Sequence, residues 1–237
     1  MLVRHGESVW NAEGRVQGQA CAGLSAVGHA QARVTAAALA SAYPDARLVT
    51  SDLQRTRETA APMEAELRTS APSDARLRER SFGRWEGLRR VEVEELDPKR
   101  SARWATGEDV VDEVGGETGE QLADRVDPVL RELLRATPVD GVTVAVTHGG
   151  SIWFGVHRTL GLPLPSLGGV ANCSLTELVA FDRAGANGAG GEPVVVLDRW
   201  NEVAHLPVEL RTGWRARTGR DETAEPSNEE TEASTAV

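Results

Sequence analysis

Cysteine, aromatic residues and long apolar runs are scarce in this chain of 237 residues. Its two cysteines, Cys21 and Cys173, have neither CxxC nor CxxxC spacing, which argues against a metal site. A disulfide between them stays open, but a reducing compartment is the simpler interpretation. No stretch reaches the roughly 18 apolar residues of a membrane span, and no charged leader with an apolar segment opens the chain. We therefore expect a cytoplasmic protein without a membrane partner.

Basic residues are also fewer than acidic ones, which gives a formal net charge of -10. Nucleic acids and anionic lipids reward a basic surface, so neither is expected as the main partner. The segment from Asp221 to Val237 holds six carboxylates and no lysine or arginine. Its Glu, Ser, Thr and Pro content cannot bury enough apolar surface to offset the entropy of ordering. We expect one domain over residues 1–210, followed by an acidic disordered tail over residues 211–237.

Two histidines stand at similar places in the apolar pattern. His5 follows Leu2-Val3-Arg4 and precedes a glycine, and His148 follows the β-branched run 142–147 and precedes Gly149. This pattern is typical of a strand that delivers a side chain to the edge of a sheet, while the glycine lets the next backbone approach a ligand closely. Two such strand ends could face one ligand.

Apolar runs of strand length alternate with helical periodicity along the chain. Ser25 is a candidate N-cap for the first long helix, and Ser51 and Asp52 for the next. This alternation predicts a three-layer α/β/α sandwich with a mostly parallel central sheet. The expected helices cover residues 25–42, 52–67, 120–136 and 152–160, and the expected strands 2–3, 48–50, 142–147, 174–181 and 193–200. The face of the first helix expected to be buried consists of Val27, Ala30, Val34, Ala37 and Ala38.

A histidine after a strand is more often structural than catalytic, and we assign His29, His157 and His205 to that structural class. Arg4 favours a catalytic role for His5 over a structural one, because a neighbouring cation favours the neutral imidazole that can act as a nucleophile. The guanidinium can also bind two oxygens of a phosphate.

Arg55 and Glu79 are the other candidates for the site. Arg55 lies early in a helix that follows a strand, so it can point into the cleft at the strand ends while Arg57 stays in solvent. Glu79 is ambiguous among many acidic residues. A carboxyl beside a basic pocket ordinarily ionises, so a general acid there requires burial or proton sharing.

The chain resembles the histidine phosphatase superfamily, in its phosphoglycerate-mutase-like branch, through motifs that fall in the expected order to about residue 207. They are Arg4-His5-Gly6-Glu7-Ser8, Trp10-Asn11, Gln17-Gly18, Leu24-Ser25, Ser51-Asp52-Leu53 with Arg55, Leu77 with Glu79, Trp85-Glu86-Gly87, Gly115-Gly116-Glu117, Thr147-His148-Gly149-Gly150, Asn172 to Leu178 and Trp200-Asn201.

The resemblance implies a ping-pong phosphoryl transfer with no metal and no cofactor. His5 would become a phosphohistidine, while Arg4, Arg55 and His148 would hold the equatorial oxygens. Glu79 would protonate the leaving alcohol and then activate water. Positions that line the pocket in relatives correspond here to Asn11, Gln17, Gly18 and Gly149.

One departure from the family favours hydrolysis over mutase chemistry. Glycerate-phosphate mutases carry a basic insertion, whereas the corresponding segment here, residues 105–113, is acidic and would repel a bisphosphate. We expect a metal-independent phosphomonoesterase acting on a small phosphorylated metabolite. The alternatives are a phosphoglycerate mutase and a phospho-ligand binding module without turnover. The physiological substrate and the choice between monomer and homodimer stay open.

Overall fold

The computed structural model describes residues 1–20, 23–181 and 193–213. The tail predicted to be disordered lies outside the described residues from position 214 on. Cys21 lies outside them too, whereas Cys173 is buried with a free thiol. Among the described residues, no helix is long and apolar enough to cross a membrane.

The described strands form one five-stranded sheet with the order β2-β3-β1-β4-β5. β1 pairs parallel with β3, which pairs parallel with β2, while β4 joins β1 antiparallel and pairs antiparallel with β5. The predicted strand positions and the parallel core are confirmed; the two late strands add an antiparallel edge. The bounds are β1 Leu2–Arg4, β2 Arg47–Thr50, β3 Thr143–Thr147, β4 Leu175–Phe181 and β5 Val194–Glu202.

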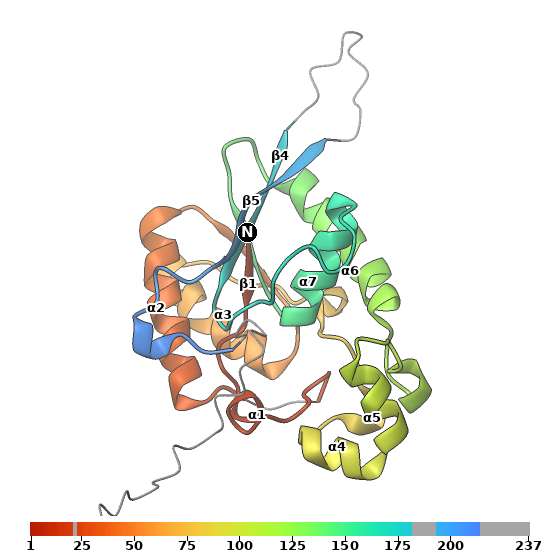
Figure 1. The fold of residues 1–237 in the computed structure, drawn as a ribbon. Coiled ribbons are helices and arrows are strands. Elements are labelled where there is room, and N and C mark those ends of the chain that lie inside the picture. The colour runs from red at the N-terminus through yellow and green to blue at the C-terminus, as the bar shows by residue number, and fades with distance from the viewer. Residues whose placement is uncertain (21–22, 182–192, 214–237) are drawn as a thin grey trace, which may run out of the picture.

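Helices cover both faces of this sheet, as Figure 1 shows. α2 (Ala26–Ala42) and α3 (Gln54–Leu67) pack with Val3, Val144 and Val146 in one apolar core. α6 (Gly119–Ala136) and α7 (Gly149–Leu160) pack with Leu2 and Ala145 in another. Successive residues of β1 and β3 alternate between the two cores, as the pleat of a strand requires. The predicted three-layer sandwich is confirmed.

Three shorter helices lie outside the two main cores. α1 (Val9–Ala12) follows the strand end at His5, and α4 (Arg90–Leu96) and α5 (Pro98–Ala105) form a small lobe beside the sandwich (Figure 1). This lobe has its own apolar cluster around the fully buried Trp85.

Three local predictions were wrong in detail. α2 buries Gly28, Gln31, Ala32, Thr35, Ala36 and Leu39 instead of the apolar set expected for it. Polar members are tolerated there because they are hydrogen-bonded: Gln31 accepts from the Glu7 N–H and donates to the carbonyl of Leu210. The N-cap of α3 is Leu53, without a side-chain cap. α7 begins at Gly149, three residues earlier than expected, with His148 as its N-cap.

Candidate active site

His5 lies directly after β1 at the centre of the sheet and is 2% exposed. Its N–H donates to the carbonyl of Thr147 at 2.9 Å, which continues the pairing of β1 with β3. The ring Nδ1 lies 2.7 Å from the carbonyl of Gly6, so Nδ1 carries the proton. Nε2 then has a free lone pair, and it accepts from the Nε of Arg55 at 3.2 Å. The ring of His5 is therefore fixed by backbone at Nδ1 and by a cation at Nε2, the candidate nucleophilic atom.

Gly6 is required at its position by close packing. A Cβ there would lie 2.6 Å from the carbonyl oxygen of Gly28 at the start of α2. The Gly6 N–H donates to the Thr59 hydroxyl of α3 at 3.0 Å. The turn after His5 is thus clamped between two helices.

Two arginines reach the same site from different elements. Arg55 is 1% exposed and donates, besides its contact with His5, to the carbonyls of Gly18 at 2.7 Å and Ala20 at 3.1 Å. Arg4 donates to the carbonyl of Val170, while its buried Nε has no hydrogen-bond partner among the described residues. A buried guanidinium N–H without a partner is costly unless a ligand binds it.

His148 is fully buried, and its ring lies edge-to-face on that of His5 with centroids 5.3 Å apart. Its Nε2 lies 3.0 Å from the Ser51 hydroxyl, which also accepts from the Leu53 N–H at 3.4 Å. A hydroxyl that accepts from Leu53 is free to donate to His148, which leaves the ring proton on Nδ1. That buried Nδ1 has no partner within the described chain. The site thus presents a second donor to an anion.

Electrostatics keep both rings neutral. Burial lowers the pKa of His5 well below its ordinary value of 6.5, and the positive charges of Arg55 and Arg4 lower it further. Burial also lowers the pKa of His148, as does the charge of Arg55. α3 and α7 begin beside these residues, and helix N-termini favour anions. The surroundings therefore favour a bound anion and disfavour a protonated imidazole.

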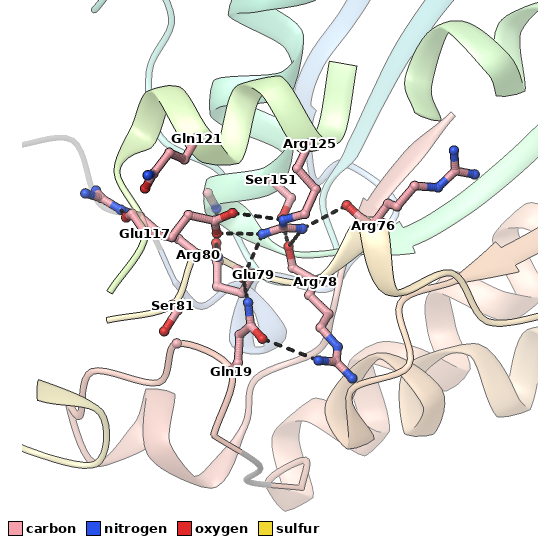
Figure 2. Close-up of polar contacts among 12 residues, drawn as sticks. Gln19, Arg76, Arg78, Glu79, Arg80, Ser81, Glu117, Gln121, Arg125 and Ser151 are labelled. Atoms are coloured by element: carbon pink, nitrogen blue, oxygen red, sulfur yellow. Dashed lines mark hydrogen bonds and ion pairs between the residues drawn. The ribbon is translucent and has the colours of Figure 1, made fainter. Parts of the chain in front are cut away.

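Glu79 lies in an irregular segment after the turn at Ala75–Leu77 (Figure 2). Its Oε2 accepts from the N–H of Gly150 in α7 at 3.0 Å, and its Oε1 accepts from the N–H of Arg80 at 2.8 Å. The side chain is half-buried. The carboxyl is thus fixed on the first turn of the helix that His148 caps.

The other predicted site residues lie around His5 and Arg4. Asn11 accepts from Asn172, which also donates to the carbonyl of His5 at 3.1 Å. Gln17 accepts from the Ser8 hydroxyl at 2.8 Å. Gly18, at a φ of 54°, presents its carbonyl to Arg55. A Cβ on Gly149 would lie 3.3 Å from the Nε of Arg4, so the glycine leaves space beside that nitrogen.

Sequence reasoning missed three polar residues of this region. Asn172 and Ser51 are fully buried and hold His5 and His148. Arg125 on α6 contacts the segment that carries Glu79. One signal was present for it, because an arginine three residues after Leu122 falls on the apolar side of a helix.

The histidines assigned to structural roles lie away from these residues. His157 is buried, its Nδ1 lying 2.7 Å from the carbonyl of Trp153, and His205 lies 3.0 Å from the Thr35 hydroxyl. His29 is exposed on α2. In the described part of the chain, no group of three or more His, Cys, Asp or Glu side chains is arranged to hold a metal ion.

The acidic segment 105–113 is less repulsive than its sequence suggested. Asp109 pairs with Arg80, and Glu108 pairs with Arg103 at 2.5 Å. Glu113 pairs with both Arg100 and Arg103. Because these arginines offset the carboxylates, the predicted repulsion of a bisphosphate carries little weight against mutase chemistry.

Comparisons with known proteins show the family of the chain. The family model of the histidine phosphatase superfamily (branch 1) matches residues 1–187. This chain belongs to that superfamily. Glucosyl-3-phosphoglycerate phosphatase of Mycolicibacterium vanbaalenii is 35% identical over 222 residues, covering 87% of this chain and 95% of the relative. Metal-independent phosphoserine phosphatase of Arabidopsis thaliana is 32% identical over 211 residues, covering 87% and 82%.

A solved structure of mycobacterial glucosyl-3-phosphoglycerate phosphatase in complex with VO3 has a TM-score of 0.72 and 32% identity. The match covers 85% of this chain and 98% of that one. The predicted family, the phosphoglycerate-mutase-like fold and the prediction of a phosphatase are confirmed by these relatives.

Proposed function

We propose that this chain hydrolyses a small phosphorylated metabolite in two steps through a phosphohistidine on His5. The observation that carries this assignment is the pairing of a neutral, oriented Nε2 on His5 with buried, unpartnered donors on Arg4 and His148. The three non-bridging oxygens of a phosphate ester, which become equatorial in the transition state, can accept from these donors. The proposed nucleophile and the proposed anion-binding donors thus lie side by side.

In the first step, the Nε2 lone pair of His5 forms a bond to phosphorus while the bond from phosphorus to the ester oxygen breaks. Arg55 shifts its hydrogen bond from Nε2 to a phosphate oxygen, and Arg4 and His148 hold the other oxygens. Glu79, when protonated, gives its proton to the leaving oxygen. The products are the free alcohol and a phosphohistidine.

In the second step, the Glu79 carboxylate takes a proton from water, and the water oxygen bonds to phosphorus. The bond from phosphorus to Nε2 breaks, which releases inorganic phosphate and restores His5. Asn11, Gln17, Gly18 and Gly149 lie around His5 and Arg4, and the family pattern supports assigning them to substrate contacts. No step requires a metal ion or an organic cofactor.

The relatives guide the choice of substrate class. Glucosyl-3-phosphoglycerate and phosphoserine, the substrates in the two relatives' names, are both phosphate esters of a three-carbon acid. We therefore infer that an ester of this class is the substrate. The acidic net charge supports the absence of a nucleic-acid partner. The low cysteine content supports a reducing compartment, and we keep the cytoplasm as the proposed location. We keep one domain over residues 1–210 with a tail over 211–237 as the proposed organisation, and light scattering decides between monomer and homodimer.

The test is a phosphate-release screen over phosphorylated glycerates, phosphoserine, sugar phosphates and nucleotides, run beside a mutase assay. We expect release of phosphate from a three-carbon acid ester, unchanged after treatment with a chelator. Bisphosphate-dependent interconversion of phosphoglycerates without net phosphate release would favour the mutase instead. Binding of these esters without turnover would favour the non-catalytic module. Loss of activity in chelator would contradict the metal-independent mechanism.

A further inference from the structure

The segment that carries Glu79 has no strand or helix to fix it at that position. It begins within the short 3₁₀ turn at Ala75–Leu77, and each carbonyl from residue 76 to residue 79 is bound by a side chain from elsewhere in the fold. Thr147 of β3 donates to the Leu77 carbonyl at 2.7 Å. Ser151 of α7 donates to the Arg78 carbonyl at 2.8 Å. Hydrogen bonds from side chains thus hold this segment, where backbone-to-backbone hydrogen bonds would hold a strand.

Arg125 makes more of these contacts than any other side chain shown in Figure 2. Its Nη1 donates to the carbonyls of Arg76 at 2.8 Å and Arg78 at 2.9 Å, and its Nη2 donates to the carbonyl of Glu79 at 3.3 Å. Three carbonyls of one irregular segment therefore converge on one planar guanidinium. Only an arginine has enough donors in a fixed plane for this arrangement.

Glu117 holds the guanidinium from the other side. Its carboxylate accepts from the Nε of Arg125 at 2.9 Å and from the Nη2 at 2.6 Å, a bidentate pair. The two side chains are 23% and 18% exposed, so water screens the pair only in part. Glu117 precedes α6, and its carbonyl also accepts from Arg80, the residue after Glu79. Arg125 and Glu117 together therefore bind the backbone before Glu79 and the side chain of Arg80 after it.

We propose that Arg125, oriented by Glu117, is a positioning residue that sets the Glu79 carboxyl for proton transfer to the leaving group and from water. This inference rests on the proposed function, because it needs Glu79 to be the proton donor. Arg125 reaches the chemistry only through the backbone of residues 76–79. Its loss allows that segment to relax, and a displacement of about 1 Å in a catalytic group can cost about 100-fold in rate.

The alternative is that Arg125 has a purely structural role and only stabilises the packing of α6 against the rest of the fold. The two roles differ in their dependence on the leaving group. A p-nitrophenolate leaves without help from a proton, whereas an alkoxide needs one. Misplacement of the acid therefore slows poor leaving groups selectively, while a general loss of folded enzyme slows all substrates equally.

The experiment measures kcat/KM of Arg125→Gln, Arg125→Lys and Glu117→Gln for p-nitrophenyl phosphate, phenyl phosphate and glycerol 3-phosphate. This ratio reports the formation of the phosphohistidine, because release of the alcohol ends that step. Arg131→Gln is the matched control: it lies on the same helix, pairs with Asp127 and donates to the Thr159 carbonyl of α7. Glu79→Gln gives the reference pattern for a missing acid.

We expect Arg125→Gln to lower kcat/KM for glycerol 3-phosphate by about 100-fold and for p-nitrophenyl phosphate by about threefold at most. Arg125→Lys and Glu117→Gln should show the same selectivity with smaller losses, and they carry the test if Arg125→Gln does not fold. Equal losses on all three substrates, no loss, or the same selectivity in Arg131→Gln would overturn the positioning role. If Glu79→Gln itself shows no selectivity, the acid role of Glu79 fails instead.

Discussion

His5 and Glu79 face one site from segments whose backbones are fixed in different ways. His5 directly follows a strand paired on both sides, with its N–H bound to β3 and its ring Nδ1 bound to the carbonyl of the next residue. Glu79 follows a short turn, and the carbonyls around it are bound by side chains from β3, α6 and α7. The comparison teaches that the position of the proposed nucleophile depends on sheet pairing, whereas the position of the proposed acid depends on a few distant polar side chains.

The largest effect is expected where the nucleophile itself is removed. His5→Ala takes away the only side chain proposed to bond to phosphorus, so phosphate release should fall by about 10⁴-fold or more, as for the nucleophile in other enzymes with covalent intermediates. His29→Gln on the exposed face of α2 serves as the control and should leave activity unchanged. Undiminished phosphate release by His5→Ala would remove His5 from the mechanism.

The second effect concerns the cation beside the nucleophile. Arg55→Gln removes the donor that lies 3.2 Å from His5 and the charge proposed to stabilise the transferring phosphoryl group. We expect kcat/KM to fall by about 10²-fold to 10³-fold on good and poor leaving groups alike. Arg57→Gln, two residues along the same helix, removes an exposed arginine that contacts the Ala71 carbonyl and Ser73. Similar losses of kcat/KM in Arg55→Gln and Arg57→Gln would contradict a specific role for the Arg55 guanidinium beside His5.

A smaller effect is expected from the loss of a single side chain that supports the segment carrying Glu79. Ser151→Ala removes one hydrogen bond to the Arg78 carbonyl, worth about 1 kcal/mol. The expected loss is about fivefold, confined to poor leaving groups. Steady-state kinetics on p-nitrophenyl phosphate and glycerol 3-phosphate measure it. An equal loss on p-nitrophenyl phosphate would mean that Ser151 supports the nucleophile instead.

The smallest effect is on stability and follows from the buried, neutral rings. Because the pKa values of His5 and His148 lie well below 6.5 in the folded protein, the unfolded chain binds more protons below about pH 6.5. Stability should therefore fall as the pH is lowered from about 6.5, and thermal denaturation at pH 7 and pH 5 measures this. His148→Gln should show a smaller fall than wild type. An identical pH dependence in the variant would contradict a lowered pKa at His148.

Much of the nucleophile's surroundings could be predicted from sequence because the signals are local. An apolar run followed by Arg4-His5 and a glycine defines a strand end within a few residues, and the same holds for Thr147-His148. Arg55 was predictable from its place early in a helix after a strand. The family motifs then assigned different roles to the two histidines.

The supports of the site could not be read from local patterns. The partners of Glu79 lie 46 residues away at Arg125 and 71 residues away at Gly150. Gln31 and Thr35 face inward on α2 because distant groups satisfy them, so a purely apolar stripe misplaced the buried face. The charge pairing of the acidic segment 105–113 could not be read either, since its arginine partners include Arg80 and Arg100, outside the segment. Such pairings exist only once the chain is folded.

The most direct test of the central claim is to trap the intermediate. Enzyme turning over p-nitrophenyl [³²P]phosphate is quenched in alkali, and the labelled peptide is identified, with Glu79→Gln included to slow hydrolysis of the intermediate. We predict label that survives alkali, is lost in acid and lies on the peptide that contains His5, and none in His5→Ala. Label on another residue, or full turnover with no labelled protein in either enzyme, would contradict a phosphohistidine on His5.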